Sequence, residues 1–206
     1  MAATAKPLAK KKNNNGSAIK AAIIIIILIG LVVGYYYYLN NRTKQRVESQ
    51  DKLTVTQELL ARNLTYNYPP TPKEVVRFYS EITKCFYNES YTNEELEQLA
   101  EKIRELYDEE LLEKNDWNQY LVDLNREIQT YKEKNIHVIN YSLSPSTDVD
   151  FYNVGEKEVA RLYCTFVLQS GSTKQNVEEV FVLRKDEDGH WKILGWDHAD
   201  KVKEEE

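Results

Sequence analysis

The sequence predicts one α+β domain that follows a single transmembrane helix. An uncharged apolar run covers residues 21–39. Apolar residues then recur with the helical period of 3.6 from residue 72 to about residue 131. After Asn135 the period changes to two, which is typical of strands. This order predicts three helices packed on one face of a curved antiparallel sheet.

The apolar run has the length of a membrane span. Its nineteen residues extend about 28 Å as a helix, close to the thickness of a bilayer core. A cleaved signal peptide is the competing interpretation, but its apolar part is usually shorter and ends at small residues. Here the run ends in four tyrosines, which suit a membrane interface. The residues expected to carry the anchor are Ile23, Ile27, Gly30, Gly34, Tyr35 and Tyr38.

Charges on the two sides of this run predict its orientation. Five lysines and no acidic residue precede it, so residues 1–20 are expected to be a basic cytosolic tail. The C-terminal part is then expected outside the cell, behind a single span of the plasma membrane. Gly30 and Gly34 form a GxxxG pair, which is either a face for helix dimerisation or two small residues in an apolar helix. A homodimer is therefore one of the two possibilities for this pair.

Residues 40–69 are charged and carry few apolar side chains. They are expected to be either a helical juxtamembrane stalk or the first element that docks on the domain. Pro69 and Pro70 end any helix and mark the start of the domain, predicted over residues 70–206.

Helix starts can be read from the first half of the domain. Thr71 and Glu74 form a capping box, with a proline at the first helical position. Thr92 and Glu95 form a second box, and apolar residues at helical spacing follow each of them. Asn115 is expected to cap the third helix.

The second half of the domain is expected to be an antiparallel meander. A short extended segment over residues 148–152 turns at Gly155. Alternate residues from Ala160 to Leu168 are expected to face the core. Gly171 and Gly189 lie in the two turns that follow.

Composition limits the partners of the C-terminal part. Beyond residue 38 the chain has 22 basic and 33 acidic residues, which argues against binding nucleic acid or an anionic membrane surface through bulk charge. Cys85 and Cys164 are too few for a disulfide framework, and two buried free thiols are favoured over one bridge. The sequence has no phosphate-binding glycine motif and no zinc-ligand spacing, so no cofactor is expected.

The last hairpin resembles a known fold. Residues 180–184, Gly189 and residues 191–193 read as a strand, a glycine turn and a Trp-Lys-Ile strand. This pattern resembles the nuclear transport factor 2-like fold, the cone of the SnoaL-like proteins, over about residues 70–200. With the anchor included, the chain is also similar to an uncharacterised family of single-pass membrane proteins of Gram-positive gut bacteria. The stretches that carry this second likeness are residues 67–76, 79–87 and 188–197.

The resemblance implies a pocket between the sheet and the helices, and it supplies no activity. Aromatic side chains expected in the interior either line such a pocket or fill the core with hydrogen-bonded hydroxyls. The residues assigned to the pocket are Phe78, Tyr79, Tyr107, Tyr163, Phe166, Trp191 and Trp196.

No catalytic or metal-binding residue is assigned. Some SnoaL-like proteins use a His/Asp pair, and Asp197 with His198 is the comparable local pair here. Neighbouring residues on a strand point to opposite faces, so a solvated strand end is favoured. Asp148 and Asp150 share a face if extended, but they lack the ligand spacing of a calcium loop, and a solvated turn is favoured.

Three functional hypotheses remain. The first is a non-enzymatic interaction or assembly module of the cell envelope, anchored in the bilayer through residues 21–39 and bound to a protein partner. The second is a component of a conjugation or type IV secretion channel, whose assembly subunits resemble this layout. The third is a SnoaL-like enzyme or small-ligand-binding protein that uses the aromatic interior.

Overall fold

The structure, a computed structural model, describes Tyr35 and residues 53–200. The chain divides into two units, Met1–Lys52 and Leu53–Glu206. In the first unit Tyr35 is helical and exposed. Within the described residues no helix is both long and apolar enough to cross a membrane. The predicted features that lie outside the described residues are the tail at 1–20, the rest of the span at 21–39, and with it Ile23, Ile27, Gly30, Gly34 and Tyr38.

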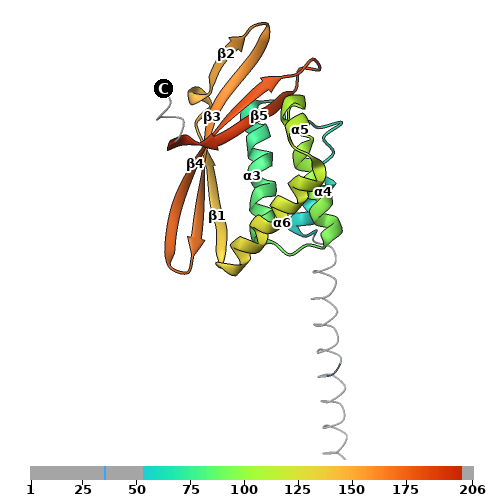
Figure 1. Ribbon diagram of the computed structural model, residues 1–206, viewed down its shortest axis with the longest axis vertical. Coiled ribbons are helices and arrows are strands. Elements are labelled where there is room, and N and C mark those ends of the chain that lie inside the picture. Colours follow the sequence, from blue (N-terminus) through green and yellow to red (C-terminus); the bar gives the residue numbers. More distant parts are fainter. Residues whose placement is uncertain (1–34, 36–52, 201–206) are drawn as a thin grey trace, which may run out of the picture. The chain divides into compact units, whose positions relative to one another are not determined.

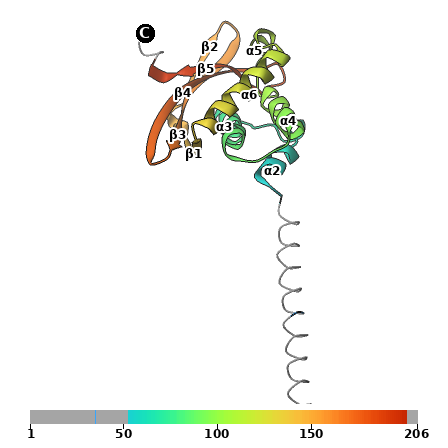
Figure 2. The same ribbon diagram turned by 60° about the horizontal axis from the view of Figure 1, so that its bottom comes forward.

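The described part of the second unit is α+β, as predicted, with helices on one side of a curved antiparallel sheet (Figures 1 and 2). α3 lies against the sheet; α2, α4 and α6 pack against α3, and α5 contacts β5 (Trp191–His198). The helices of this part are α2 (Val55–Ala61), α3 (Pro72–Asn88), α4 (Asn93–Arg104), α5 (Glu109–Lys114), α6 (Trp117–Glu133) and the 3-10 turn η1 (Ser146–Asp148).

The threonines read as caps do start α3 and α4. The Thr92 hydroxyl accepts from the backbone N–H of Glu95 (3.1 Å), and the Glu95 carboxylate accepts from the backbone N–H of Thr92 (2.8 Å). The Thr71 hydroxyl likewise accepts from the backbone N–H of Glu74 (3.2 Å). The second half of that box does not form, because the Glu74 carboxylate pairs with Arg77.

The expected cap of the third long helix is wrong by one residue. Asp116, not Asn115, caps α6, and its carboxylate accepts from the backbone N–H of Gln119 (3.0 Å). Asn115 instead ends the short helix α5, where its side-chain amide donates to the carbonyl of Leu111 (2.8 Å). The sequence did not predict α5, because six residues are too few to establish a helical period.

One antiparallel sheet follows the helices. Its order is β1-β3-β4-β5, and β2 pairs with the first part of β3 while β1 pairs with the last part. The turns predicted at Gly155, Gly171 and Gly189 are confirmed, with φ angles of 62°, 58° and 83° that favour glycine. The strands are β1 (Ile136–Leu143), β2 (Asp150–Val154), β3 (Lys157–Ser170), β4 (Thr173–Lys185) and β5 (Trp191–His198).

The inward-facing residues of β3 and the buried face of α3 form the core. Ala160, Leu162 and Cys164 are fully buried, which confirms the predicted alternation. α2 adds Leu59 to the same core, and Leu64 joins it from the loop that follows. Residues 53–69 therefore belong to the compact unit, which fits the second of the two interpretations offered for this segment.

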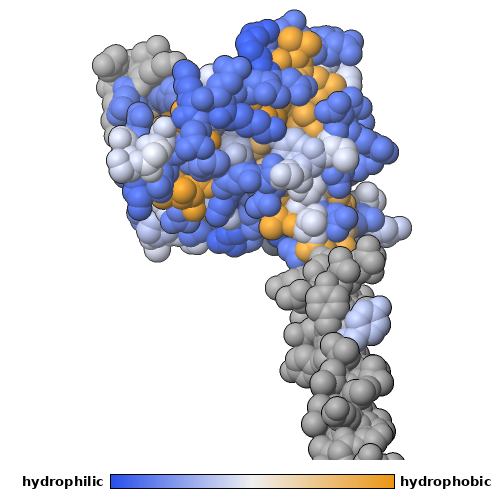
Figure 3. Space-filling model, turned by 90° about the horizontal axis from the view of Figure 1, so that it is seen from below, coloured by the Kyte–Doolittle hydropathy of each residue, from blue (hydrophilic) through white to orange (hydrophobic). Residues whose placement is uncertain are grey.

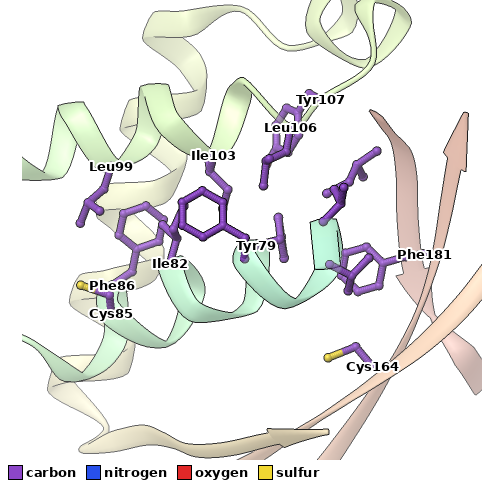
Figure 4. Packing of buried hydrophobic residues seen from close by; sticks show 14 of the residues in the cluster. Tyr79, Ile82, Cys85, Phe86, Leu99, Ile103, Leu106, Tyr107, Cys164 and Phe181 are labelled. Carbon is purple, nitrogen blue, oxygen red and sulfur yellow. The ribbon is translucent and has the colours of Figure 1, made fainter. Parts of the chain in front are cut away.

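Both cysteines are free and buried. The Cys85 sulfur lies 3.5 Å from the hydroxyl of Thr56, and the Cys164 sulfur lies 3.4 Å from the hydroxyl of Ser80. Figure 4 shows Cys85 among the helices and Cys164 on the sheet, on different elements of the core. The structure thus confirms the two buried free thiols that the sequence favoured.

Candidate functional site

A cavity of about 210 Å³ lies between the helices and strand β5. It is smaller than the roughly 300–1,000 Å³ typical of sites for drug-sized ligands, so it suits a small guest. Its aromatic lining consists of Tyr79, Phe86, Tyr87, Tyr107, Tyr120 and Trp196. Its polar lining consists of Thr83, Asn115, Asp123 and Glu127, and Ile103 and Leu124 complete the wall.

Three of the aromatic residues assigned to a pocket meet in this cavity. The ring centroids of Tyr79 and Trp196 are 5.3 Å apart, and those of Tyr107 and Trp196 are 5.6 Å apart. Behind them the ring of Phe181 stacks on Trp196 at 6.1 Å. Figure 4 shows Tyr79 on α3, Phe181 at the sheet, and Tyr107 beside Leu106 near the end of α4. The rings of three separate elements thus enclose one side of the cavity.

The other four assigned residues lie elsewhere. Phe78 borders a separate surface pocket beside Pro69. Tyr163 is half-buried and occupies the β3 face opposite the core, because it alternates with the buried residues of that strand. Phe166 is buried at an inward position of β3 and does not line the cavity. Trp191 is buried at the start of β5, outside the cavity.

The tyrosines of the cavity keep their protons. Burial raises the pKa of Tyr79 and Tyr107 well above the usual value, and it raises the pKa of Tyr120 to about 12. The hydroxyls of Tyr107 and Tyr120 interact with each other, and the Tyr87 hydroxyl interacts with the Glu127 carboxylate. The cavity therefore presents neutral aromatic rings with a few hydroxyl groups.

Carboxylates supply the negative charge at this site. Asp123 and Glu127, on α6, are exposed residues of the lining. Glu179, on β4, lies next to the cavity and interacts electrostatically with Tyr79 and Glu127. Burial first, and then the carboxylates of Glu127 and Asp197, raise the pKa of Glu179 to about 7. Among residues 53–200, no basic side chain forms an ion pair with Glu127 or Glu179.

The acidic residues of the site were missed in the sequence, although a signal was present. Glu179 pairs in register with the buried Cys164 and precedes the buried Phe181 by two residues, so the strand period places it on the inner face. Glu127 lies seven residues after Tyr120 and four before Tyr131, on one face of α6. A charged residue at an inward position is the feature that reveals such a site.

A larger groove of about 760 Å³ lies between the end of α4 and the β4–β5 turn, and it shares Tyr107 with the cavity. Its charged groups largely satisfy one another. The Asp108 carboxylate accepts from the Arg184 guanidinium (Nε to Oδ2, 2.9 Å) and caps α5 by accepting from the backbone N–H of Glu110 (3.0 Å). The Lys192 ammonium donates to the carbonyl of Glu105 (2.8 Å). These contacts join β4 and β5 to the helices, so they are structural.

Three possible metal ligands lie in the turn between β4 and β5. The ligand atoms of Asp186, Asp188 and His190 all lie within 4.8 Å of one another. The Asp186 carboxylate already accepts from the backbone N–H of His190 (2.7 Å), a contact that shapes the turn itself. The geometry of this turn therefore accounts for the group without an ion.

The His/Asp pair weighed from the sequence lies at the end of β5. Asp197 and His198 are both exposed, and the Asp197 carboxylate accepts from the backbone N–H of His198 (2.7 Å). Neither residue lines the cavity.

Figure 3 shows that the face seen from below is mostly hydrophilic, with hydrophobic residues in separate patches.

Comparison with known proteins gives a family. Residues 9–196 match a family described as a domain of unknown function, DUF6715. The chain belongs to this family. The DUF6715 match covers both the apolar run at 21–39 and the domain that carries the cavity. No curated protein matches the chain.

Proposed function

We propose that this protein is a membrane-anchored, extracytoplasmic binding module of the cell envelope, and that it binds through the aromatic cavity. The observation that carries the proposal is this cavity, which combines rings from α3, α6 and β5 with carboxylates on its rim. The uncharged run at residues 21–39 supports the anchor, and the family match extends over that run as well as the domain.

The finer description of the fold is also a proposal. We infer that residues 70–200 form a nuclear transport factor 2-like cone behind a transmembrane helix. Long helices that precede a bent antiparallel meander support this assignment, as does a cavity between them.

The topology predicts which side of the membrane the domain occupies. Because both native cysteines are buried, a cysteine introduced in the exposed β3–β4 turn by Ser172→Cys is expected to react with a membrane-impermeant maleimide on intact cells. Ser17→Cys, in the predicted cytosolic tail, is the matched control and should react after permeabilisation alone. Labelling of Ser172→Cys that also requires permeabilisation would place the domain inside the cell.

Binding through the cavity predicts extra mass on the purified protein. Native mass spectrometry of the full chain, released from a maltoside micelle, is expected to show a small adduct that disappears on denaturation. An adduct unchanged by Tyr120→Ala, which removes part of the cavity lining, would contradict this site. A clean mass, with no adduct from cells grown in rich medium, would remove the support for a small ligand.

Catalysis is the second candidate, and Glu179 is the observation that favours it. A carboxyl group with a pKa of about 7 can accept and donate a proton at physiological pH. If the site is catalytic, the Glu179→Gln variant should retain an adduct of different mass from the one on the wild-type protein. The same mass on both proteins supports binding alone.

A further inference from the structure

The walls of the cavity are suited to a particular kind of guest. Tyr79 on α3 and Tyr107 in the α4–α5 loop both pack against Trp196 on β5, with ring centroids 5.3 and 5.6 Å from that of Trp196. Tyr87 and Tyr120 add two more rings to the lining. The face of an aromatic ring carries partial negative charge, and several such faces around one small volume attract a cation.

The charged residues at the rim of the cavity also favour a cation. Asp123 and Glu127 belong to the lining, and Glu179 lies beside it. Asp123 is already paired with Arg126 (2.9 Å), which leaves Glu127 and Glu179 without an ion-pair partner in residues 53–200. Glu179 is also partly desolvated, so its carboxylate lacks part of its hydration. A guest cation there supplies an interaction that water supplies only in part.

A native cation lies near Tyr107 and Tyr120 of the cavity wall. The Arg104 guanidinium lies over the rings of Trp117 (5.4 Å) and Tyr120 (5.7 Å) and donates to the carbonyl of Asn115 (2.9 Å). These contacts fix the position of the guanidinium beside Tyr120. An anionic guest would have this one cation beside it, together with the carboxylates of Glu127 and Glu179.

From these observations we propose that the cavity binds a small organic ammonium ion. The packed rings of Tyr79, Tyr107 and Trp196 form one wall of the cavity, against which its methyl or methylene groups lie. The carboxylates of Glu127 and Glu179 balance its charge. The cavity volume of about 210 Å³ limits the guest to a compact ion of the size of choline or a short amine. This inference rests on the proposed binding role of the cavity and assigns its ligand class.

The test compares a cation with its neutral isostere. The full chain in dodecyl maltoside, which carries no ammonium group, is titrated by calorimetry with choline, with tetramethylammonium and with 3,3-dimethylbutan-1-ol. The last compound has the shape of choline without its charge. Choline is expected to bind at least about tenfold more tightly than the neutral isostere, because ring faces and carboxylates recognise the charge.

Variants at the rim locate the binding. At pH 8, Glu127→Gln and Glu179→Gln are each expected to weaken choline binding by about three- to tenfold. Glu133→Gln is the matched control, because it makes the same charge change on α6 at an exposed residue outside the lining. Unchanged urea unfolding curves for Glu127→Gln would show that its effect is on binding.

The outcomes separate this inference from the proposed function. Equal affinity for choline and its neutral isostere, or no response to either ammonium ion, overturns the ammonium assignment. If native mass spectrometry still shows a neutral or anionic adduct, the cavity remains a binding site with another ligand class. Cysteine labelling that places the domain inside the cell overturns the extracytoplasmic proposal and leaves the calorimetric result unaffected.

Discussion

Replacement of Asp108 by Ala is expected to lower the free energy of unfolding of the domain by about 3 kcal/mol. Asp108 is 5 % exposed, and its carboxylate receives the Arg184 guanidinium through two nitrogen atoms. Removal of Asp108 leaves the Arg184 charge with the longer contact to Glu110 (3.4 Å). The expected loss lies at the lower end of the usual range, because the Arg184 side chain remains 23 % exposed. Urea unfolding of the full chain in maltoside, followed by circular dichroism, measures the change.

Two further variants divide this loss into its causes. Asp108→Asn keeps a side chain that can cap α5 but removes the charge, so it should retain about 1 kcal/mol of the lost stability. Glu110→Ala removes the more exposed partner of Arg184 and should cost much less stability than Asp108→Ala. A loss in Glu110→Ala that equals or exceeds the loss in Asp108→Ala would contradict this account of the ion pair.

Replacement of Glu179 by Gln is expected to stabilise the domain at high pH by about 2–3 kcal/mol. The folded pKa of Glu179 is about 7, above the ordinary value of 4.5, because the carboxyl is buried beside other acids. The folded state therefore holds a proton that the unfolded state releases. The groups that face Glu179 are Tyr79 on α3, Glu127 and Tyr131 on α6, Cys164 on β3, and Asp197 and His198 on β5.

The direction of the pH dependence follows from this shift. Below about pH 4.5 Glu179 is protonated in both states, and the wild type and the Gln variant should have equal stability. As the pH rises from about 4.5 to 7, the wild type loses stability, because the unfolded state releases a proton that the folded state still holds, and above pH 7 the loss levels off. The difference between the two proteins should therefore grow from pH 5 to pH 8 in urea unfolding experiments.

A neighbouring residue provides the control for this prediction. Glu178→Gln makes the same substitution one position earlier, on the exposed face of β4. It should not reproduce the pH-dependent gain. If Glu178→Gln and Glu179→Gln gain the same stability at pH 8, the effect comes from the net charge of the domain and not from burial at Glu179.

Local signals in the sequence predicted most of the fold. Thr71 and Thr92 start helices because a hydroxyl at the cap satisfies a backbone N–H of the first turn, whatever the rest of the fold does. Glycines at 155, 171 and 189 mark turns because the backbone there has positive φ. α5 was not predicted, because six residues are too few to establish a helical period.

The site was predicted less completely, because it depends on which face of each element a side chain occupies. Tyr79, Tyr107 and Trp196 reach the cavity, and a register shift between Val182 and Leu183 helps to place Trp196 opposite Phe181. Such a bulge leaves no clear mark in the sequence. The alternation along β3 places Tyr163 on the outer face. Tyr163 was assigned to the pocket because it is aromatic, although its position in the strand pattern pointed the other way.

The two buried thiols can serve as native probes of local opening in the domain. Burial raises the pKa of Cys85, and it raises the pKa of Cys164 to about 11, so both stay protonated and inert while the core is closed. A cysteine-specific alkylating reagent reaches Cys85 when the packing between α2 and α3 separates, and Cys164 when α3 separates from the sheet. The two alkylation rates in the native chain therefore report, without any added label, which layer opens first.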